Sequence, residues 1–550
     1  MAVLAAVIFV AAHSDPNRQH SLTILAFAVA GLAVGCLLLA VNAGEPSAVR
    51  APWLLTGSIV GALCAAAFAY YGGMRQLGGF DHSILVDTGW RLFRGQRPFH
   101  DFPSTTPIGF ALGAQLAFQG FGVSWKALTL FNAIFCASAL LWTCGLSLRI
   151  FLRQPLLAFV LALCINCMAL LVVCFWWYNP ITLTTAIVFV LSSVHWLLHP
   201  RSFAAVASCF FSALLLSMMK ANTAGILLVG SSLTLLFSTE HRRAAFTVFA
   251  AAFLAFLLIL WTMGISLPAL LAGYTAVASR GVGLGQSFSD AIGREIWLSV
   301  AGLAAMLLPL LVAGYLRSGW RMPNGIQSLG VVSLIGGIIA FFADGELKLV
   351  ALSLIFLSTV LLVSRRVDTP GKPSSLFIPR AWAAYLILLG TIFASVALGQ
   401  GVTRHRVMTT GPGRFFEYKM VEAPIASGFF GGLRSGPILR ASLSEIEQLL
   451  ASAGAPKRIY FGPRMQWGYA ACGIDSPSGQ PVWWHPGVAF DAKKEPVYLE
   501  RWMDRKFDVL VFYKDDHTYF SPEFLELIAG NYNRDDRYSA LTVYRRKGIS

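Results

Sequence analysis

The chain has 550 residues, of which 56% are hydrophobic and only 13% are charged, and its mean hydropathy of +0.65 excludes an ordinary soluble protein. The net charge of +15 does not indicate nucleic-acid binding, because residues 1–399 hold 22 Lys and Arg against 11 Asp and Glu, mostly in short loops between apolar stretches. We therefore predict a polytopic α-helical membrane protein with about 12–13 transmembrane helices and a small C-terminal α/β soluble domain.

The chain begins with an apolar stretch, residues 1–12, that would be about 18 Å long as a helix. This is shorter than a hydrocarbon core of about 30 Å, so the stretch is either a short span or the end of a longer segment that starts upstream. A cleaved signal peptide is disfavoured, because the stretch has no basic region before it. Twelve further spans are predicted from apolar length, at 21–42, 53–72, 127–148, 155–175, 180–198, 203–219, 223–237, 244–263, 297–316, 326–343, 347–363 and 381–399.

Short loops on alternate sides of these spans differ in charge, and this difference predicts the orientation. Eight of the 11 carboxylates before residue 400 lie in the other, poorly basic loops, which we place outside together with the tail after Gln400. Acidic residues hardly influence topology, so we interpret their excess as a sign of catalysis on the outer face. The basic loops, which should face the cytoplasm, carry Arg50, Arg149, Arg153, Arg201, Arg242, Arg243, Arg317, Arg321, Arg365, Arg366, Lys372 and Arg380.

The tail alternates helical and strand patterns, which favours a mainly parallel sheet. Ser442 and Glu445 have the spacing of a capping box at the start of a helix over 442–453. A second helix should begin at Ser521 with Pro522 in its first turn. Strands are predicted within 458–463, 507–513 and 538–546.

Cysteine and aromatic clusters elsewhere have structural interpretations. Cys164 and Cys167 form a CxxC inside an apolar run without further ligands, which favours core packing over metal binding. The run from Trp176 to Tyr178 is interpreted as an aromatic belt at the membrane interface. The segment from Trp483 to Gly487 could stack on a glycan, although turn and core packing are the preferred interpretation.

Residues 80–107 form the most unusual stretch, because three carboxylates, two histidines and three arginines gather in one loop between apolar regions. A short amphipathic helix is predicted between Asp81 and Asp101, ending at Gly95 and lying in the interface plane. Residues 107–121, which are short and Gly-rich, are interpreted as a half-inserted or interfacial helix that completes this loop. Asp87, inside the helix, is expected to be an exposed polar position.

The pattern of this loop is an acid after a core span, an amphipathic helix, then Gly95-x-x-Pro98-Phe99-x-Asp101-Phe102 and a further proline. It resembles the first external loop of the GT-C integral-membrane glycosyltransferases, among them the protein O-mannosyltransferases and the lipid A aminoarabinose transferases. These enzymes take sugar from a polyprenyl-phosphate carrier. The resemblance implies that Asp81 is the catalytic base and that Asp101 positions the acceptor or a metal. The alternatives are that Asp81 caps the following helix and that Asp101 is a turn residue.

Lys220 is the most informative cation, because it lies between apolar stretches where a charge costs at least about 2.5 kcal/mol to insert. A lipid phosphate would compensate for this cost, whereas snorkelling to the interface is the alternative. Asn222 could add a hydrogen bond. Arg280, Arg294, Arg404 and His405 complete the residues assigned to the donor phosphate, although each could instead be an interfacial anchor. Asp344, Glu346, Lys348 and His100 form a further candidate polar site.

These inferences define three regions: additional N-terminal membrane segments (1–50), a GT-C-like catalytic membrane domain (51–400, first external loop 73–106), and an extracytoplasmic α/β domain (401–550). We expect an inverting glycosyltransferase in the bacterial cytoplasmic membrane, acting on its outer face. Its partners would be a polyprenyl-phosphate-linked sugar, the lipid bilayer and an envelope lipid, glycan or protein acceptor. No cofactor is indicated, and the need for a divalent metal is left open. A glycan polymerase or ligase with a diphosphate-linked donor is the main alternative, and a lipid or solute transporter the other.

Overall fold

The computed structural model divides into two compact units. One takes the described residues within Met1–Tyr70, Asn132–Phe256 and Val282–Thr403, and the other those within Tyr71–Phe131, Leu257–Gly281 and Arg404–Ser550. The described residues are 50–75, 77, 79–104, 106–171, 174–238, 242–278, 325–343, 348–368, 373–403, 406–408, 415–417, 424–435, 437–451, 456, 458–486, 489–514, 516–517 and 519–548.

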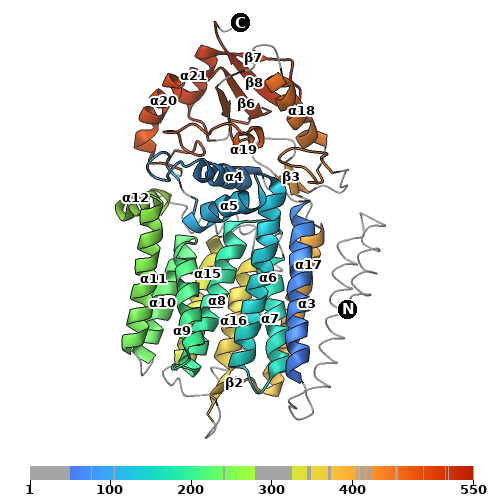
Figure 1. The fold of residues 1–550 in the computed structure, drawn as a ribbon, viewed down its shortest axis with the longest axis vertical. Helices are drawn as coiled ribbons and strands as arrows, with labels where there is room; N and C mark the ends of the chain where they lie inside the picture. Colours follow the sequence, from blue (N-terminus) through green and yellow to red (C-terminus); the bar gives the residue numbers. More distant parts are fainter. Residues whose placement is uncertain are drawn as a thin grey trace. The chain divides into compact units, whose positions relative to one another are not determined.

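The first unit is built from apolar helices (Figure 1). Ten of the twelve predicted spans coincide with helices, whereas the spans predicted at 21–42 and 297–316 lie outside the described residues. Within the described part of the chain, α3, α6, α8, α11 and α17 are long and apolar enough to cross a membrane. The helices are α3 (Arg50–Gly73), α6 (Trp125–Ile150), α7 (Pro155–Leu170), α8 (Tyr178–Leu198), α9 (Phe203–Ser217), α10 (Ala221–Ser238), α11 (Arg242–Thr262), α15 (Gly325–Ala343), α16 (Lys348–Val363) and α17 (Arg380–Thr403).

Helix α8 forms the centre of this unit. Its most apolar 18-residue window is 94% buried, and the helix contacts α7, α9, α10, α15 and α16. The corresponding window of α3 is only 17% buried, and Trp53 and Leu63 on that helix are exposed. An exposed apolar helix of this length is stable only where lipid replaces water. The predicted polytopic helical membrane fold is therefore confirmed.

Two short elements in the loops were not predicted. Part of the stretch between the predicted spans 244–263 and 297–316 is a helix, α12 (Leu267–Ala278), in the second unit. The basic loop before α17 contains a hairpin of β1 (Arg365–Val367) and β2 (Ser375–Phe377). Both elements are too short to produce a clear periodic signal in a sequence of this apolar content.

The second unit brings the loop after α3 together with the tail. Its loop part contains α4 (Gly79–Phe93) and α5 (Ile108–Phe121). The two helices pack closely because Gly89 has no side chain, and a Cβ atom there would overlap Ala114. The tail contributes β3 (Arg406–Met408), β4 (Phe415–Glu417), α18 (Pro437–Ala451), β5 (Ile459–Phe461), α19 (Trp467–Cys472), η1 (Ala492–Lys494), α20 (Glu495–Asp504), β6 (Val509–Tyr513), α21 (Pro522–Asn531), β7 (Tyr532–Asp535) and β8 (Leu541–Arg546).

The tail sheet has the order β5-β6-β8-β7 and confirms the small C-terminal α/β fold (Figure 1). The prediction of a mainly parallel sheet is wrong, because only β5 and β6 are parallel, whereas β8 is antiparallel to both β6 and β7. The reason is that β7, which was not predicted, follows α21 directly and turns back into β8. A tight turn between consecutive strands makes them antiparallel.

An aromatic core lies against this sheet. Trp502 and Phe524, both without exposed surface, pack with ring centroids 4.8 Å apart, and Trp484 lies 4.3 Å from Phe524. The preference for core packing of the segment that holds Trp484 is therefore confirmed. Ser521 caps α21 as predicted, since its side chain accepts a hydrogen bond from the Phe524 N–H.

The predicted capping box of the first tail helix is wrong. Helix α18 begins at Pro437, five residues before Ser442, so Ser442 lies inside the helix. The Glu445 carboxylate instead accepts backbone N–H bonds from Ser539, Ala540 and Leu541, at 2.7 to 3.1 Å. It thereby holds the segment that leads into β8, which is a tertiary contact that local spacing does not reveal.

Candidate functional site

The predicted amphipathic helix is present as α4 and ends where expected. Asp81 lies half-buried in its first turn, as the third residue rather than as the N-cap. A carboxylate in the first turn of a helix is stabilised by the N-terminal dipole. At the other end Gly95 adopts φ +82°, a left-handed conformation that glycine favours, and its N–H donates to Leu92. The helix thus separates Asp81 from the turn that carries Asp101.

Asp101 lies in a tight turn after α4 and is held by the turn itself. One carboxylate oxygen accepts the Arg97 backbone N–H at 2.7 Å and lies 3.4 Å from Arg97 Nε, and the other is 2.7 Å from His100 Nδ1. Partial burial alone would raise the pKa of Asp101, but these hydrogen bonds outweigh burial and lower it. The side chain is 24% exposed, so an ionised carboxylate remains accessible to a ligand.

Phe99, at the centre of this turn, has a strained backbone. Its φ is +64°, a region that bulky residues rarely adopt. The turn is closed by bonds from the Phe99 N–H to the Phe102 carbonyl and from the Asp101 N–H to the Arg97 carbonyl, both at 2.8 Å. The Phe99 ring lies directly on Gly273 of α12, where no side chain would fit. Strained residues of this kind are concentrated at functional sites.

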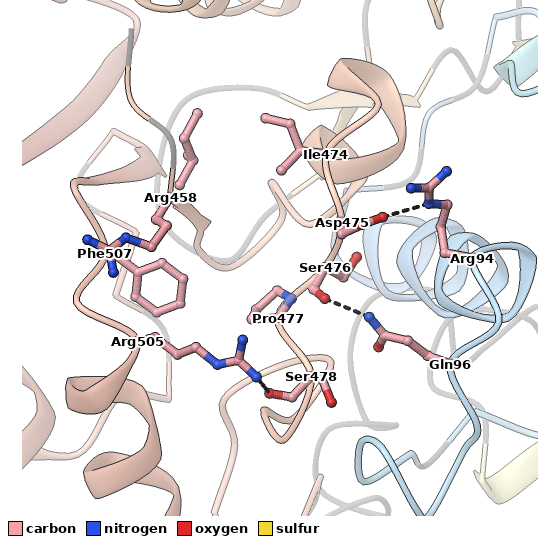
Figure 2. A pocket seen from close by; sticks show the side chains of 11 residues that line it. Arg94, Gln96, Arg458, Ile474, Asp475, Ser476, Pro477, Ser478, Arg505 and Phe507 are labelled. Carbon is pink, nitrogen blue, oxygen red and sulfur yellow. Dashed lines mark hydrogen bonds and ion pairs between the residues drawn. The ribbon is translucent and has the colours of Figure 1, made fainter. Parts of the chain in front are cut away.

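The tail segment 474–480 forms several hydrogen bonds with the stretch 80–107, which carries Asp81 and Asp101 and is called the acid-bearing loop below. The Gly479 N–H donates to the Asp101 carbonyl at 2.6 Å, and Trp90 Nε1 donates to the Ile474 carbonyl at 2.8 Å. Figure 2 shows two further contacts, from Gln96 to the Ser476 carbonyl and between Arg94 and Asp475. The position of Asp101 therefore depends on residues almost 400 positions later in the chain.

A buried ion pair lies beneath this contact. Arg91 Nε donates to Asp87 at 2.9 Å, and both side chains are closed to solvent. Ser476 donates to the other Asp87 oxygen at 2.5 Å, and Arg91 Nη1 donates to the Pro477 carbonyl at 3.0 Å. Burial is the strongest influence on Asp87 and raises its pKa. The expectation of an exposed Asp87 is wrong, because the tail covers this face of α4.

Asp101 also lines a cavity of about 990 Å³ within the second unit. One wall is the turn with Phe99, His100 and Asp101, the second is α12, and the third is the tail between Ala489 and Arg501. Asp81 is not among the residues that line it. No sequence motif marks the tail residues of this wall. Those with polar or aromatic side chains are Phe490, Asp491, Lys494, Tyr498 and Arg501.

Lys220 belongs to the first unit, at the turn between α9 and α10. Its Nζ donates to the Asn179 side-chain oxygen at 3.1 Å and lies 5.4 Å from the centroid of the Tyr178 ring. Both partners belong to the first turn of α8. The cation is therefore held at one end of the helix bundle, which is compatible with either phosphate binding or snorkelling.

Several predicted site residues cannot be placed. Asn222 and Lys348 belong to α10 and α16, but their side chains lie outside the described part of the structure. The remaining candidates lie outside the described residues, and they are Arg280, Arg294, Asp344, Glu346, Arg404 and His405.

Trp176, predicted to belong to an aromatic belt, is 5% exposed and packs on Phe135, so it is a core residue and not part of an exposed belt.

Among the described His, Cys, Asp and Glu side chains, no group of three lies close enough together to hold a metal ion. Cys164 and Cys167 both lie in α7, Cys164 buried and Cys167 half-buried. Asp101 and His100 are in contact, but two side chains are fewer than a protein metal site usually supplies.

Neither a protein-family model nor a curated protein sequence matches this chain. The crystal structure of ArnT from Cupriavidus metallidurans bound to undecaprenyl phosphate is similar, with a TM-score of 0.52 and 12% identity over 89% of this chain and 98% of that chain. The apo structure of the same protein aligns over the same shares with 13% identity and a TM-score of 0.38. ArnT is a GT-C aminoarabinose transferase, so the structural likeness agrees with the resemblance found in the loop sequence. The likeness shows that the chain shares the fold of ArnT.

Proposed function

We propose that this protein is an inverting glycosyltransferase that moves a sugar from a polyprenyl-phosphate donor to an envelope acceptor, on the outer face of the cytoplasmic membrane. The observation that carries the proposal is the fold shared with ArnT along nearly the whole chain, since that protein was crystallised with undecaprenyl phosphate. The sequence of the acid-bearing loop supports it independently, because it matches the GT-C pattern at Asp81 and Asp101.

In this reaction Asp81 takes the proton of the acceptor hydroxyl, and the hydroxyl oxygen attacks the anomeric carbon of the donor sugar. The bond between that carbon and the phosphate oxygen breaks, and the polyprenyl phosphate leaves with the electron pair. Attack from the face opposite the phosphate inverts the anomeric configuration. General-base assistance of this kind is worth roughly 10²- to 10⁴-fold in rate.

Two other groups have defined roles in the proposal. Asp101 stays ionised at neutral pH, because its hydrogen bonds lower its pKa, and it holds the acceptor through its hydroxyl groups. Lys220 binds the donor phosphate, with Asn222, Arg280, Arg294, Arg404 and His405 as further candidates. A cation that meets the phosphate before and after bond cleavage stabilises the leaving group as its charge develops.

The direct test has a binding arm and a transfer arm. Full-length protein in nanodiscs is expected to bind undecaprenyl phosphate but not undecaprenol in native mass spectrometry, because the phosphate supplies the charge. Envelope extract incubated with enzyme and a radiolabelled undecaprenyl-phosphate sugar should yield a product with inverted anomeric configuration. A strict requirement for a diphosphate-linked donor would contradict the proposal and favour a polymerase or ligase.

A further inference from the structure

The cavity of about 990 Å³ in the second unit is defined by three walls: the turn 99–104, helix α12 and the tail segment 489–501. We propose that this cavity binds the acceptor and that the bound part of the acceptor is a hydroxyl-rich saccharide. The inference rests on the proposed function, because it takes Asp101 as a residue of the transfer site. It adds the chemical class of the acceptor and assigns a binding role to the tail.

The size of the cavity fits such a ligand. Small-molecule sites usually measure about 300–1,000 Å³, so this cavity lies at the upper end of the range. It has room for more than one sugar ring. An extended lipid chain needs a long aliphatic groove, whereas the aliphatic lining here consists only of short side chains. They are Ala269, Ala272, Ala489, Ala492 and Val497.

The polar lining is mixed in charge. Asp101 and Asp491 offer carboxylate oxygens, and Lys494 and Arg501 offer N–H donors. A lining with two acids and two bases does not favour a polyanionic or a polycationic ligand. Sugar hydroxyls donate and accept at once, so they can bond to both kinds of group. Asp101 keeps capacity for this, since a carboxylate has about four acceptor positions and the turn occupies three of them.

The aromatic lining provides flat apolar surfaces beside these polar groups. Phe102 and Phe490 are buried, whereas Phe99 and Tyr498 are half-buried and offer ring surface to the cavity. The Tyr498 ring packs on Phe490 with centroids 4.9 Å apart. The C–H face of a pyranose stacks on such rings through dispersion, while its hydroxyls point outward to hydrogen-bonding groups.

Two features fix the aromatic surfaces in place. The strained backbone of Phe99 and its contact with Gly273 direct that ring onto α12. On the tail side, the Arg501 guanidinium lies 5.9 Å from the centroid of the Tyr498 ring, so a ring and a donor are presented together. A ring beside a fixed N–H donor matches the alternating apolar and polar character of a sugar.

The chain provides a matched control for Tyr498. Tyr538 is also half-buried in the second unit, and the Arg537 guanidinium lies 5.9 Å from its centroid, but Tyr538 is not among the residues that line the cavity. Replacing either tyrosine by alanine removes the same ring from the same kind of partner. A difference between the two variants therefore reports on the cavity rather than on the loss of an aromatic residue.

The experiment measures binding of full-length protein in nanodiscs to an array of immobilised neutral, N-acetylated and acidic oligosaccharides. Wild-type protein should bind a subset of them. Binding should fall about tenfold in Tyr498→Ala and in Arg501→Gln, and remain unchanged in Tyr538→Ala. Tyr498→Phe keeps the ring and should retain binding, which separates the stacking surface from any loss of folding. No binding to any saccharide, or equal loss in both tyrosine variants, overturns the proposal.

The binding of undecaprenyl phosphate separates this inference from the proposed function. Tyr498→Ala should bind that lipid as tightly as wild-type protein, because the variant changes only the acceptor cavity. If saccharide binding depends on Tyr498 but no sugar is transferred from any polyprenyl phosphate, the cavity assignment stands and the glycosyltransferase proposal fails. If transfer occurs and the labelled sugar is recovered on an acceptor that has no saccharide of its own, the cavity assignment fails alone.

Discussion

Asp87 and Arg91 form a 2.9 Å ion pair one helical turn apart, and both side chains are almost completely closed to solvent. The pair joins the acid-bearing loop to the tail, because Ser476 donates to the same carboxylate and Arg91 donates to two tail carbonyls. One buried network thus joins five groups: the Asp87 and Arg91 side chains, the Ser476 hydroxyl, and the Pro477 and Gln480 carbonyls. Its partners come from segments far apart in the chain.

Loss of one partner of this pair should destabilise the protein strongly. Arg91→Leu leaves a buried carboxylate without its cation, which typically costs about 3–5 kcal/mol. Arg94→Gln is the matched control, because its ion pair with Asp475 is exposed and screened by solvent, so its loss should change stability little. Thermal unfolding in detergent measures both. Equal melting temperatures for the two variants would show that the buried pair does not stabilise this unit.

Asp81→Asn should abolish sugar transfer while donor binding stays nearly intact. The amide keeps the size and hydrogen bonding of the side chain but cannot accept the proton of the acceptor hydroxyl. Transfer from a radiolabelled undecaprenyl-phosphate sugar measures the first effect, and native mass spectrometry with undecaprenyl phosphate measures the second. Turnover of Asp81→Asn at the wild-type rate would contradict the assignment of Asp81 as the base.

Lys220→Met should weaken the apparent affinity for the donor far more than the apparent affinity for the acceptor. Methionine keeps an apolar stem but loses the charge, and one charge-assisted hydrogen bond is worth about 1.5–3 kcal/mol, or roughly ten- to a hundredfold in affinity. Lys126→Met, at an exposed position in α6, serves as the control. An unchanged donor titration would indicate that Lys220 only snorkels and contacts Asn179 and Tyr178.

Gly273→Ala should reduce transfer by disturbing the turn that carries Asp101. The added methyl group would overlap the Phe99 ring, so the ring and its strained backbone must shift. Gly530→Ala is the control, since that helical glycine has open space around it and alanine there should be neutral or stabilising by up to about 1 kcal/mol. We expect lower kcat/KM for the acceptor in the first variant alone. Identical kinetics in both would contradict a role for the Phe99 contact.

The tail should lose stability in acid through Asp535. Hydrogen bonds from Arg537 and then Arg545 hold the pKa of this carboxylate far below its usual value, in spite of partial burial. The unfolded chain therefore binds the proton more readily than the folded one. The stabilisation is complete above the unfolded pKa of about 3.9 and is lost as the pH falls towards the folded value. Asp535→Asn should make the melting temperature less dependent on pH between about pH 5 and about pH 3. A slope equal to that of wild type would contradict the prediction.

The sequence alone determined the membrane architecture and the loop helix, because both depend on local signals. Apolar length predicts a span without knowledge of neighbours, and every predicted span within the described residues coincides with a helix. The amphipathic pattern before Gly95 likewise predicted α4, whose end requires a residue that tolerates positive φ. Ser521 and Pro522 marked the start of α21 for the same local reason.

Only the tertiary structure decided which polar residues belong together. Asp87 appeared exposed on the pattern of α4, since the covering segment around Ser476 lies almost 400 residues away in sequence. Glu445 has the spacing of a helix cap but holds the entry to β8, and the antiparallel position of β8 depends on pairing with both of its neighbours. Tyr498 and Arg501 carry no motif, and only folding places them in the cavity lined by Asp101. Local patterns predict helices and strands because the spacing of apolar residues and the backbone preference of each residue are local properties. Contacts between distant segments depend instead on how the whole chain packs, which no single stretch encodes.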